Sequence, residues 1–342
     1  MGKTRSAPTL NDVAREAGVS TATVSRCLNS PERVIEATRQ RVMQAVESLG
    51  YTPNFAARVM AAKRSFTIGA IIPTMDNAIF ARGLQAFQDE LRERGYTLLV
   101  SSSAYDPEAE REQIRTLVAR GADGLLLIGH ERDPEIYEYL DRHQVPSLVA
   151  WSYEPEAMRP SVGFSNASAM RELADSVLAA GHRRIAMISG VTEGNDRALS
   201  RVLGVRQALQ SAGLGESALT LIETPYEIDK GAEAFRQLMA LDPRPTVVMC
   251  GNDVLAAGAL REAKGMGIAV PEQVSVTGFD DIELAGIVSP ALTTVHVPHR
   301  EMGRKAAREL VAMVEGTSAG QPVCISTHVV TRQSLAAPPD AS

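Results

Sequence analysis

The feature that most constrains this chain is a pair of short amphipathic helices predicted near its N-terminus. Thr9 and Asp12 have the spacing of a capping box, which starts a helix, and Gly18 ends that helix. Its apolar face recurs at helical spacing, at Leu10, Val13, Ala14 and Ala17. Ser20 then caps a second helix over residues 21–28. Two short helices around a glycine-containing turn indicate a helix-turn-helix, whose second helix lies in the major groove of DNA.

The distribution of charge supports this interpretation. Residues 1–64 carry ten lysines and arginines and five acids, a net charge of +5, whereas the whole chain is −6 and the remainder is therefore −11. A basic footprint confined to one end favours a polyanionic partner. An ordinary helical subdomain with a solvated basic face stays open as the alternative, because sequences that look like a helix-turn-helix are common.

The rest of the chain alternates short apolar runs with helical patterns, and 342 residues are long enough for two or more domains. Strands are predicted at residues 67–73, 96–102, 124–129, 146–151, 184–189, 219–223, 246–250 and 274–278. This alternation predicts parallel sheets covered on both faces by helices. Such sheets bind ligands at the carboxyl ends of their strands, where residues 73–80, 190–201 and 251–253 lie.

Several classes of protein find little support in the sequence. It has no phosphate-binding loop, no nucleophile elbow and no metalloprotease motif, so we expect no enzyme and no cofactor. His296 and His299 have a metal-like spacing, but Pro298 breaks the helix that would align them, so we expect no metal. No secretory signal or apolar span is visible, and three well separated cysteines are typical of free thiols in a reducing cytoplasm.

The third predicted helix ends at Gly50, and from there the match to a known family becomes close. The chain resembles the lac-repressor family of bacterial transcription regulators. The segments that carry the resemblance are LNDVAREAGVSTATVSRCLN (10–29), GYTPNFAARVMAAKRS (50–65), GHRRIAMISG (181–190), CGNDVLAAGAL (250–260) and VPEQVSVTGFDDIELAGIVSPALTTVHVP (270–298). Together they run through nearly the whole chain.

The resemblance implies a division into domains. Residues 1–53 would be the all-α helix-turn-helix DNA-binding domain, and 54–65 a hinge helix or linker. The remainder would be an α/β periplasmic-binding-protein-like core of two doubly wound parallel-sheet subdomains. The first subdomain would hold 66–163 and 296–321 and the second 164–295 and 322–342, with crossovers near Gly163, Val295 and Gln321.

The resemblance also implies which residues contact DNA. The base-reading positions fall on Thr21, Ala22 and Arg26, and the positions that hold phosphates on Ser20, Thr23, Ser25 and Asn29. Further DNA contacts are implied at Leu10, Tyr51, Asn54, Ala57 and Met60. Met60 stands where relatives carry a leucine that wedges into the minor groove. Residues 54–62 are expected to become helical only on DNA, since so short a helix is marginal in water.

Polar residues suited to a ligand follow the later strands. Asp280 and Asp281 end a strand, where a carboxylate accepts ligand hydroxyls, although a solvated turn acid is the alternative. The resemblance points to Asp280, to Asn252 as an effector contact with Asp253 as a helix cap, and to Arg201. A guanidinium suits a carboxylate or a diol, but without the family a surface salt bridge would be the simpler interpretation of this arginine.

Pocket walls are implied at Ile79, Phe80 and Tyr226. Trp151, the only tryptophan, stands where many relatives carry an aspartate. It is either a core residue or a pocket residue that stacks on a sugar and keeps its N–H for a hydroxyl. Together with AYDPEAE (104–110) and VGFSN (162–166), it is similar to gluconate-type repressors, which favours a sugar acid as effector. Where the lac-type protein has a glutamine, this chain has Val297, so we do not expect the two proteins to bind a sugar in the same way.

We therefore expect a cytoplasmic homodimer that binds a pseudopalindromic operator in double-stranded DNA and answers to a sugar or sugar acid, most simply as a repressor. A tetramer is not expected, because residues 335–342 carry no heptads and include two prolines. One alternative is a solute-binding protein for transport, opposed by the basic helices and the missing signal. The other is an α/β enzyme with a DNA-binding domain, opposed by the missing catalytic motifs.

Overall fold

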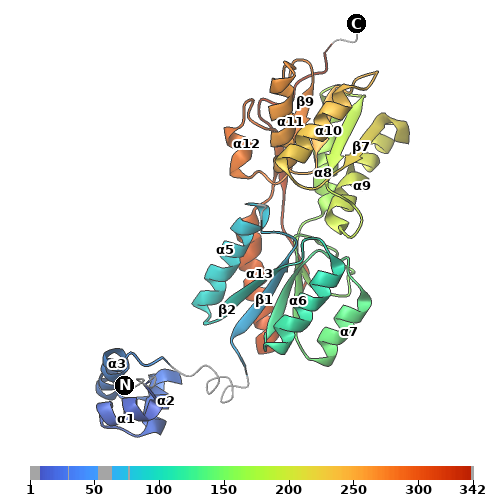
Figure 1. Cartoon of the computed structure of the whole chain (residues 1–342). Helices are drawn as coiled ribbons and strands as arrows, with labels where there is room; N and C mark the ends of the chain where they lie inside the picture. The colour runs from blue at the N-terminus through green and yellow to red at the C-terminus, as the bar shows by residue number, and fades with distance from the viewer. Residues whose placement is uncertain (1–7, 30, 53–63, 76–77, 340–342) are drawn as a thin grey trace, which may run out of the picture. The chain divides into compact units, whose positions relative to one another are not determined.

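The computed structural model describes residues 8–29, 31–52, 64–75 and 78–339, and the chain forms two compact units, Met1–Ser65 and Phe66–Ser342. Figure 1 shows the helices and strands of both units. Each unit has its own apolar core.

The smaller unit holds three helices, α1 (Leu10–Ala17), α2 (Thr21–Asn29) and α3 (Glu36–Leu49), with a 3-10 turn at Pro31–Arg33. Thr9 and Asp12 form the predicted capping box, and Gly18 and Gly50 end α1 and α3 in the left-handed region at φ 64° and 63°. The core consists of buried residues from all three helices and the segment after them, namely Val13, Ala14, Ala17, Val24, Cys27, Val42, Ala45 and Tyr51. The predicted helix-turn-helix fold is therefore confirmed.

The larger unit contains two parallel sheets, which confirms the predicted fold class. The first sheet has the strand order β11-β5-β4-β3-β1-β2. Its strands are β1 (Thr67–Ile72), β2 (Thr97–Ser102), β3 (Gly124–Ile128), β4 (Ser147–Ala150), β5 (Ser161–Gly163) and β11 (Val323–Cys324). The helices around it are α5 (Ala78–Glu93), α6 (Pro107–Ala119), α7 (Pro134–Arg142) and α13 (His299–Glu315).

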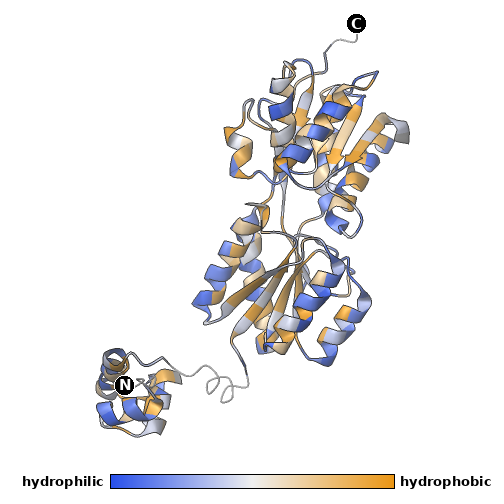
Figure 2. Cartoon of the chain, in the orientation of Figure 1, coloured by the Kyte–Doolittle hydropathy of each residue, from blue (hydrophilic) through white to orange (hydrophobic). Residues whose placement is uncertain are grey.

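The second sheet has the order β7-β6-β8-β9. Its strands are β6 (Ile185–Ser189), β7 (Leu219–Glu223), β8 (Val247–Cys250) and β9 (Ser275–Thr277). The helices that accompany it are α8 (Asn166–Ala179), α9 (Asp196–Ser211), α10 (Ile228–Met239), α11 (Asp253–Gly265) and α12 (Glu283–Ile287), with a 3-10 turn at Glu216–Ala218. Hydropathy colouring shows that the strands of both sheets are mainly apolar and that the helices around them carry polar residues (Figure 2).

The chain passes between the two sheets three times. It leaves the first sheet after β5, returns through β10 (Thr294–His296) to α13, and passes again between β11 and β12 (His328–Val330), which pairs antiparallel with β10. The third passage was expected near Gln321 and lies after Cys324. The reason is that Val323 and Cys324 pair with β5 and still belong to the first sheet.

All eight predicted strands are present, whereas β5, β10, β11 and β12 were not predicted. These four have only two or three residues each, too few for an apolar pattern to stand out. Close approach of α5 and α13 depends on two glycines. A Cβ on Gly303 would collide with the carbonyl oxygen of Gly83, and a Cβ on Gly83 would lie 2.5 Å from the Trp151 ring. This packing brings the start of α13 next to Trp151.

Candidate functional sites

The second helix of the helix-turn-helix presents a polar face. Ala22 and Arg26 are exposed, while Val24 and Cys27 on the opposite face are buried in the core. Thr21, Thr23 and Ser25 are half-buried at the margin. The Ser20 hydroxyl accepts from the Thr23 amide at 3.1 Å and caps the helix. The base-reading positions named from the sequence therefore lie on or beside the face that can enter a groove.

Two other predicted DNA contacts lie in or against the apolar core of this unit. Tyr51 is buried in the core of this unit, and Leu10 is half-buried against it. Both therefore contribute to packing, which a sequence match alone does not reveal. The side chain of Asn29, and Asn54, Ala57 and Met60 with the expected hinge helix, lie outside the described residues.

The predicted effector residues gather at the carboxyl ends of parallel strands. Trp151 follows β4 in the first sheet, and Ile79 and Phe80 begin α5 after β1. In the second sheet, Tyr226 follows β7, Asn252 follows β8 and Asp280 follows β9, while Arg201 projects from α9. Open α/β sheets bind ligands at this end. The two sheets thus contribute residues to one junction, as the contacts below show.

Arg201 is buried and held from three sides. Its Nε donates to Oδ1 of Asn166 at 2.9 Å, and its Nη1 donates to the carbonyl oxygen of Gly251 at 2.6 Å. The guanidinium lies over the Phe279 ring, 3.9 Å from its centroid. Its Nη2 is 3.9 Å from Oδ1 of Asp280. The surface-salt-bridge alternative therefore does not describe this arginine. Asn166 and Phe279 are partners that the sequence analysis missed.

Asp280 is the least satisfied polar residue of the junction. It is fully buried, and neither carboxylate oxygen has a hydrogen-bond partner among the described residues. Burial raises the pKa of this carboxyl to about 7, although the charge of Arg201 opposes the shift. Its backbone has φ 102°, in a region that side chains rarely adopt, and such strain is concentrated at functional sites. Asp281, in contrast, binds Arg332 at 2.6 Å and His296 at 2.8 Å.

Asn252 takes the capping role that was expected of Asp253. Asn252 is the N-cap of α11, because its Oδ1 accepts from the Leu255 amide at 2.9 Å. Asp253 is a buried structural acid that accepts from the Ile282 amide at 2.8 Å and from the Thr294 hydroxyl at 2.6 Å. The expectation that Asp253 is the cap was wrong. Nδ2 of Asn252 is nevertheless buried without a hydrogen-bond partner, so a donor remains at the junction.

Trp151 is buried, and its ring packs edge-on against Phe80 at 5.4 Å between centroids. Its indole N–H donates to Nδ1 of His299 at 3.2 Å. His299 is also buried, and its Nε2 lies 3.7 Å from Oδ1 of Asp280. From the sequence, His299 was weighed only as a metal ligand paired with His296. The structure instead turns His296 toward Asp281 and the ring of His328, 5.0 Å away between centroids.

Two tyrosines lie at the margin of the junction. The rings of Tyr105 and Tyr226 are 6.2 Å apart, and burial raises the pKa of both hydroxyls. Tyr105 follows β2 and was not predicted. Ile79 and Phe80 are buried in the core that also contains Trp151.

The two sheets are also joined directly by residues at the start of α9. Oδ2 of Asp196 accepts from the main-chain amide of His130 at 2.6 Å, and Nη1 of Arg197 donates to the carbonyl oxygen of Ile128 at 3.0 Å. In the first sheet, Ile128 is the last residue of β3 and His130 lies two positions after it. These contacts fasten the second sheet to the first beside the buried polar cluster.

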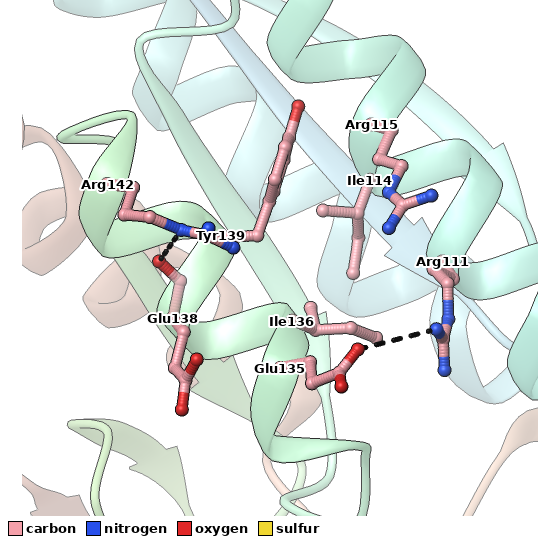
Figure 3. A pocket seen from close by; sticks show the side chains of 8 residues that line it. All are labelled: Arg111, Ile114, Arg115, Glu135, Ile136, Glu138, Tyr139 and Arg142. Atoms are coloured by element: carbon pink, nitrogen blue, oxygen red, sulfur yellow. Dashed lines mark hydrogen bonds and ion pairs between the residues drawn. The ribbon is translucent and has the colours of Figure 1, made fainter.

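A groove between α6 and α7 lies apart from these residues (Figure 3). It is lined by Arg111, Ile114, Arg115, Glu135, Ile136, Glu138, Tyr139 and Arg142. It contains side chains of both charges, and Arg111 and Glu135 form an ion pair at 3.9 Å. None of its residues was predicted as a site. Among the described residues, no group of three or more histidines, cysteines and acids is arranged to hold a metal ion.

Comparison with known proteins gives a consistent assignment. Residues 9–54 match the family of bacterial regulatory proteins of the lacI type, and residues 174–335 match a periplasmic binding protein-like domain. The HTH-type transcriptional regulator GntR of Pseudomonas aeruginosa is 36% identical over 92% of this chain and 91% of its own length. A structure of the lac repressor dimer bound to operator and the anti-inducer ONPF has a TM-score of 0.86 at 26% identity, over 96% of this chain and 99% of that one. The cellobiose complex of the regulator CelR has a TM-score of 0.70 at 29% identity, with the same coverage.

The chain belongs to the lacI family of DNA-binding transcriptional regulators. The two alternatives, a transport protein and an enzyme, are not favoured, because the relatives that match nearly its whole length are regulators of transcription. Of the helices in the described part of the chain, none has the length and apolar character that a membrane crossing needs.

Proposed function

We propose that this protein is a repressor that binds a pseudopalindromic operator as a homodimer and loses or gains operator affinity when a small hydroxylated molecule binds between its two sheets. A two-fold protein suits two half-sites one turn of DNA apart. We assign base reading to Thr21, Ala22 and Arg26, and phosphate contacts to Ser20, Thr23 and Ser25. The exposure of Ala22 and Arg26 supports this assignment.

The observation that carries the effector proposal is the unpartnered polar cluster at the junction. Asp280 offers two acceptor oxygens and Asn252 a donor, all buried without hydrogen-bond partners in the described structure. A buried polar group without a partner costs about 1–3 kcal/mol, so such a cluster is most simply explained by a ligand that satisfies it. With Arg201 alongside, it suits a molecule rich in hydroxyls. We infer a sugar or sugar acid of the gluconate type.

The junction also offers a route from effector to DNA. The links from Asp196 and Arg197 to the end of β3 hold one arrangement of the two sheets. A ligand at the junction that favours another arrangement shifts the equilibrium between them by its difference in affinity. By reciprocity, operator DNA must change effector affinity by the same factor as the effector changes operator affinity.

The DNA-binding part is tested by selecting duplexes from a random library with the full chain and sequencing those retained at several salt concentrations. We expect a two-fold symmetric consensus. A protein that retains duplexes without sequence preference would contradict the proposed repressor. Sedimentation of the protein–duplex complex should give two chains per duplex, and a stable complex with four would exclude the dimer.

The effector part is tested by a thermal-shift screen of D-gluconate, other sugar acids and neutral sugars. A ligand that binds only the folded state stabilises it by about 2.7 kcal/mol at a hundredfold excess over its dissociation constant. The same compounds are then added to the protein–operator complex. A compound that raises the melting temperature but leaves operator affinity unchanged would separate binding from regulation and contradict the proposal.

A further inference from the structure

The indole N–H of the only tryptophan makes a hydrogen bond inside the protein. The indole nitrogen of Trp151 donates to Nδ1 of His299 at 3.2 Å, across 148 positions of sequence. Trp151 is 2% exposed and His299 3%. The ring is covered by Phe80, and its far edge abuts Gly83. Trp151 therefore has neither a free face for a sugar nor a free N–H for a hydroxyl, and of the two interpretations that the sequence left open it takes the place of a core residue.

This hydrogen bond fixes the tautomer of His299. An indole N–H can only donate, so Nδ1 of the histidine must be the unprotonated acceptor. Burial, followed by the charge of Arg201, lowers the pKa of His299 to about 3, although the main chain of Asp280 opposes the shift. The ring is therefore neutral near pH 7, and its single proton is on Nε2. Trp151 makes His299 a donor on the side that faces the junction.

The donor so produced makes no hydrogen bond of normal geometry with any residue that the structure describes. Nε2 of His299 has no hydrogen-bond partner among the described residues, and Oδ1 of Asp280 is 3.7 Å away, beyond hydrogen-bond distance. At this separation a single oxygen atom can lie within hydrogen-bond distance of both the donor and the acceptor. A ligand hydroxyl there would donate a hydrogen bond to ionised Asp280 and accept one from Nε2 of His299. With Asp280 ionised, an ether oxygen leaves its carboxylate unpaired and a ligand carboxylate is repelled by its charge, so neither satisfies both groups.

We propose that His299 and Asp280 together bind a single hydroxyl of the effector, and that Trp151 is a positioning residue that holds His299 in the required tautomer. This deepens the proposed function and rests on the junction being the effector site. It assigns this subsite to a hydroxyl rather than to the acid group of a sugar acid. The specificity-determining residue is then the histidine, and Trp151 acts only through it.

One arm of the test needs no effector. Because Trp151 is the only tryptophan, indole-labelled full-length protein gives one indole N–H resonance, whose position reports its hydrogen bond. His299→Asn keeps an acceptor oxygen near the place of Nδ1, so the resonance should remain that of a bonded N–H. His299→Phe removes the acceptor, and the resonance should move upfield. A resonance that is the same in the Phe variant and in the wild type would overturn the positioning role.

The second arm measures D-gluconate binding by calorimetry. His299→Asn removes the donor at Nε2 and should weaken binding about 5- to 150-fold, as expected for a partner left unpaired in a buried site. His299→Gln, whose amide reaches the place of Nε2, should recover part of the loss. Trp151→Phe should also weaken binding, because it removes the hydrogen bond that fixes the His299 tautomer, although Trp151 itself does not contact the ligand. His143→Asn, at the exposed end of α7, is the matched control and should change neither readout.

The outcomes separate the two levels of the argument. Unchanged affinity in His299→Asn, with gluconate binding to the wild type, overturns the contact while the proposed function stands. In a series of gluconates, each methylated at one hydroxyl, at least one compound should bind more weakly. If all of them bind as tightly as gluconate, the hydroxyl shared by His299 and Asp280 is overturned. If neither gluconate nor any compound of the sugar panel binds the wild type, the proposed function fails and the contact fails with it. The indole resonance would still decide the tautomer.

Discussion

The helix-turn-helix and the effector junction organise polar and apolar groups in opposite ways. In the smaller unit the core is apolar, a capping box starts α1, and the residues proposed to read DNA lie on or beside the exposed face of α2. At the junction the proposed binding groups are themselves buried, and several have no hydrogen-bond partner. The first arrangement separates stability from function, whereas the second sets them against each other. Substitutions should therefore change one property in the first region and two in the second.

The largest effect is expected from Arg201→Ala at the junction. Removing one member of a buried, hydrogen-bonded charged group costs about 2–5 kcal/mol, or about 30-fold to several thousandfold in affinity. We expect the response to D-gluconate to disappear while operator affinity without effector changes little. Fluorescence anisotropy on labelled operator, with and without gluconate, measures both.

The matched control for this variant is Arg206→Ala, an exposed arginine on the same helix, which should respond to gluconate as the wild type does. An Arg201→Ala protein that loses operator binding but still binds gluconate normally would show that Arg201 belongs to the DNA side of the mechanism.

The next effect is expected from Arg26→Ala on the exposed face of α2. A bidentate contact to guanine contributes about 1–3 kcal/mol of discrimination, or about 5- to 150-fold. We expect base preference to relax at one symmetric pair of operator positions, with no change in melting temperature, because the side chain is exposed. Repeating the duplex selection with this variant measures the preference.

Arg41→Ala, an exposed arginine on α3, serves as the control for charge alone and should leave the consensus unaltered. If Arg26→Ala lowers affinity for all duplexes equally and keeps the consensus, this arginine binds phosphate and the two regions differ less than proposed.

An effect of similar size, but a gain and not a loss, is expected for the stability of Asp280→Asn. The folded pKa of about 7 exceeds the ordinary value of 3.8, so between these pH values the folded state holds a proton that the unfolded state has lost. Stability from this group is present at low pH and is lost as the pH rises to about 7. The variant removes that loss and should be more stable at pH 8 by about 1–3 kcal/mol, the usual cost of an unsatisfied buried group.

Melting temperatures at pH 5 and pH 8 measure this difference, and Asp229→Asn, an exposed acid paired with Arg261, is the control. The same Asp280→Asn variant should respond poorly to gluconate. A variant that is no more stable than the wild type at pH 8 would mean that Asp280 is satisfied in the free protein.

The two regions also differ in how much of them can be predicted from the sequence. Thr9 and Asp12 are three positions apart, as are Ser20 and Thr23, so their hydrogen bonds follow from local spacing. The eight predicted strands follow from apolar runs in the same way. In contrast, the bond from Trp151 to His299 spans 148 positions, and that from Arg201 to Asn166 spans 35. No local pattern predicts such pairs.

Tertiary packing decides the places of both Asp253, whose expected capping role was wrong, and Trp151, for which the sequence left two interpretations open. Asp253 fits the usual pattern of a helix cap, yet burial against the Thr294 hydroxyl gives it another partner and leaves the cap to Asn252. Trp151 has the chemistry of a sugar platform, yet the packing of α5 and α13 covers it. In both cases the type of residue was informative, but the partner was decided by tertiary packing.

The smallest effect is expected from Thr9→Ala at the start of α1. The Thr9 hydroxyl exchanges hydrogen bonds with Asp12 within the capping box, and removing such a cap costs about 1 kcal/mol. Because this loss is local, only the stability of the smaller unit should fall, with the base preference unchanged. Hydrogen exchange on the full chain separates the two units. Amides of α1 and α3 should exchange about fivefold faster, as about 1 kcal/mol implies. Amides of the two sheets should keep their wild-type rates. Thr9→Ser, which retains the hydroxyl, should restore protection, and faster exchange in the sheets would mean that the two units share stability.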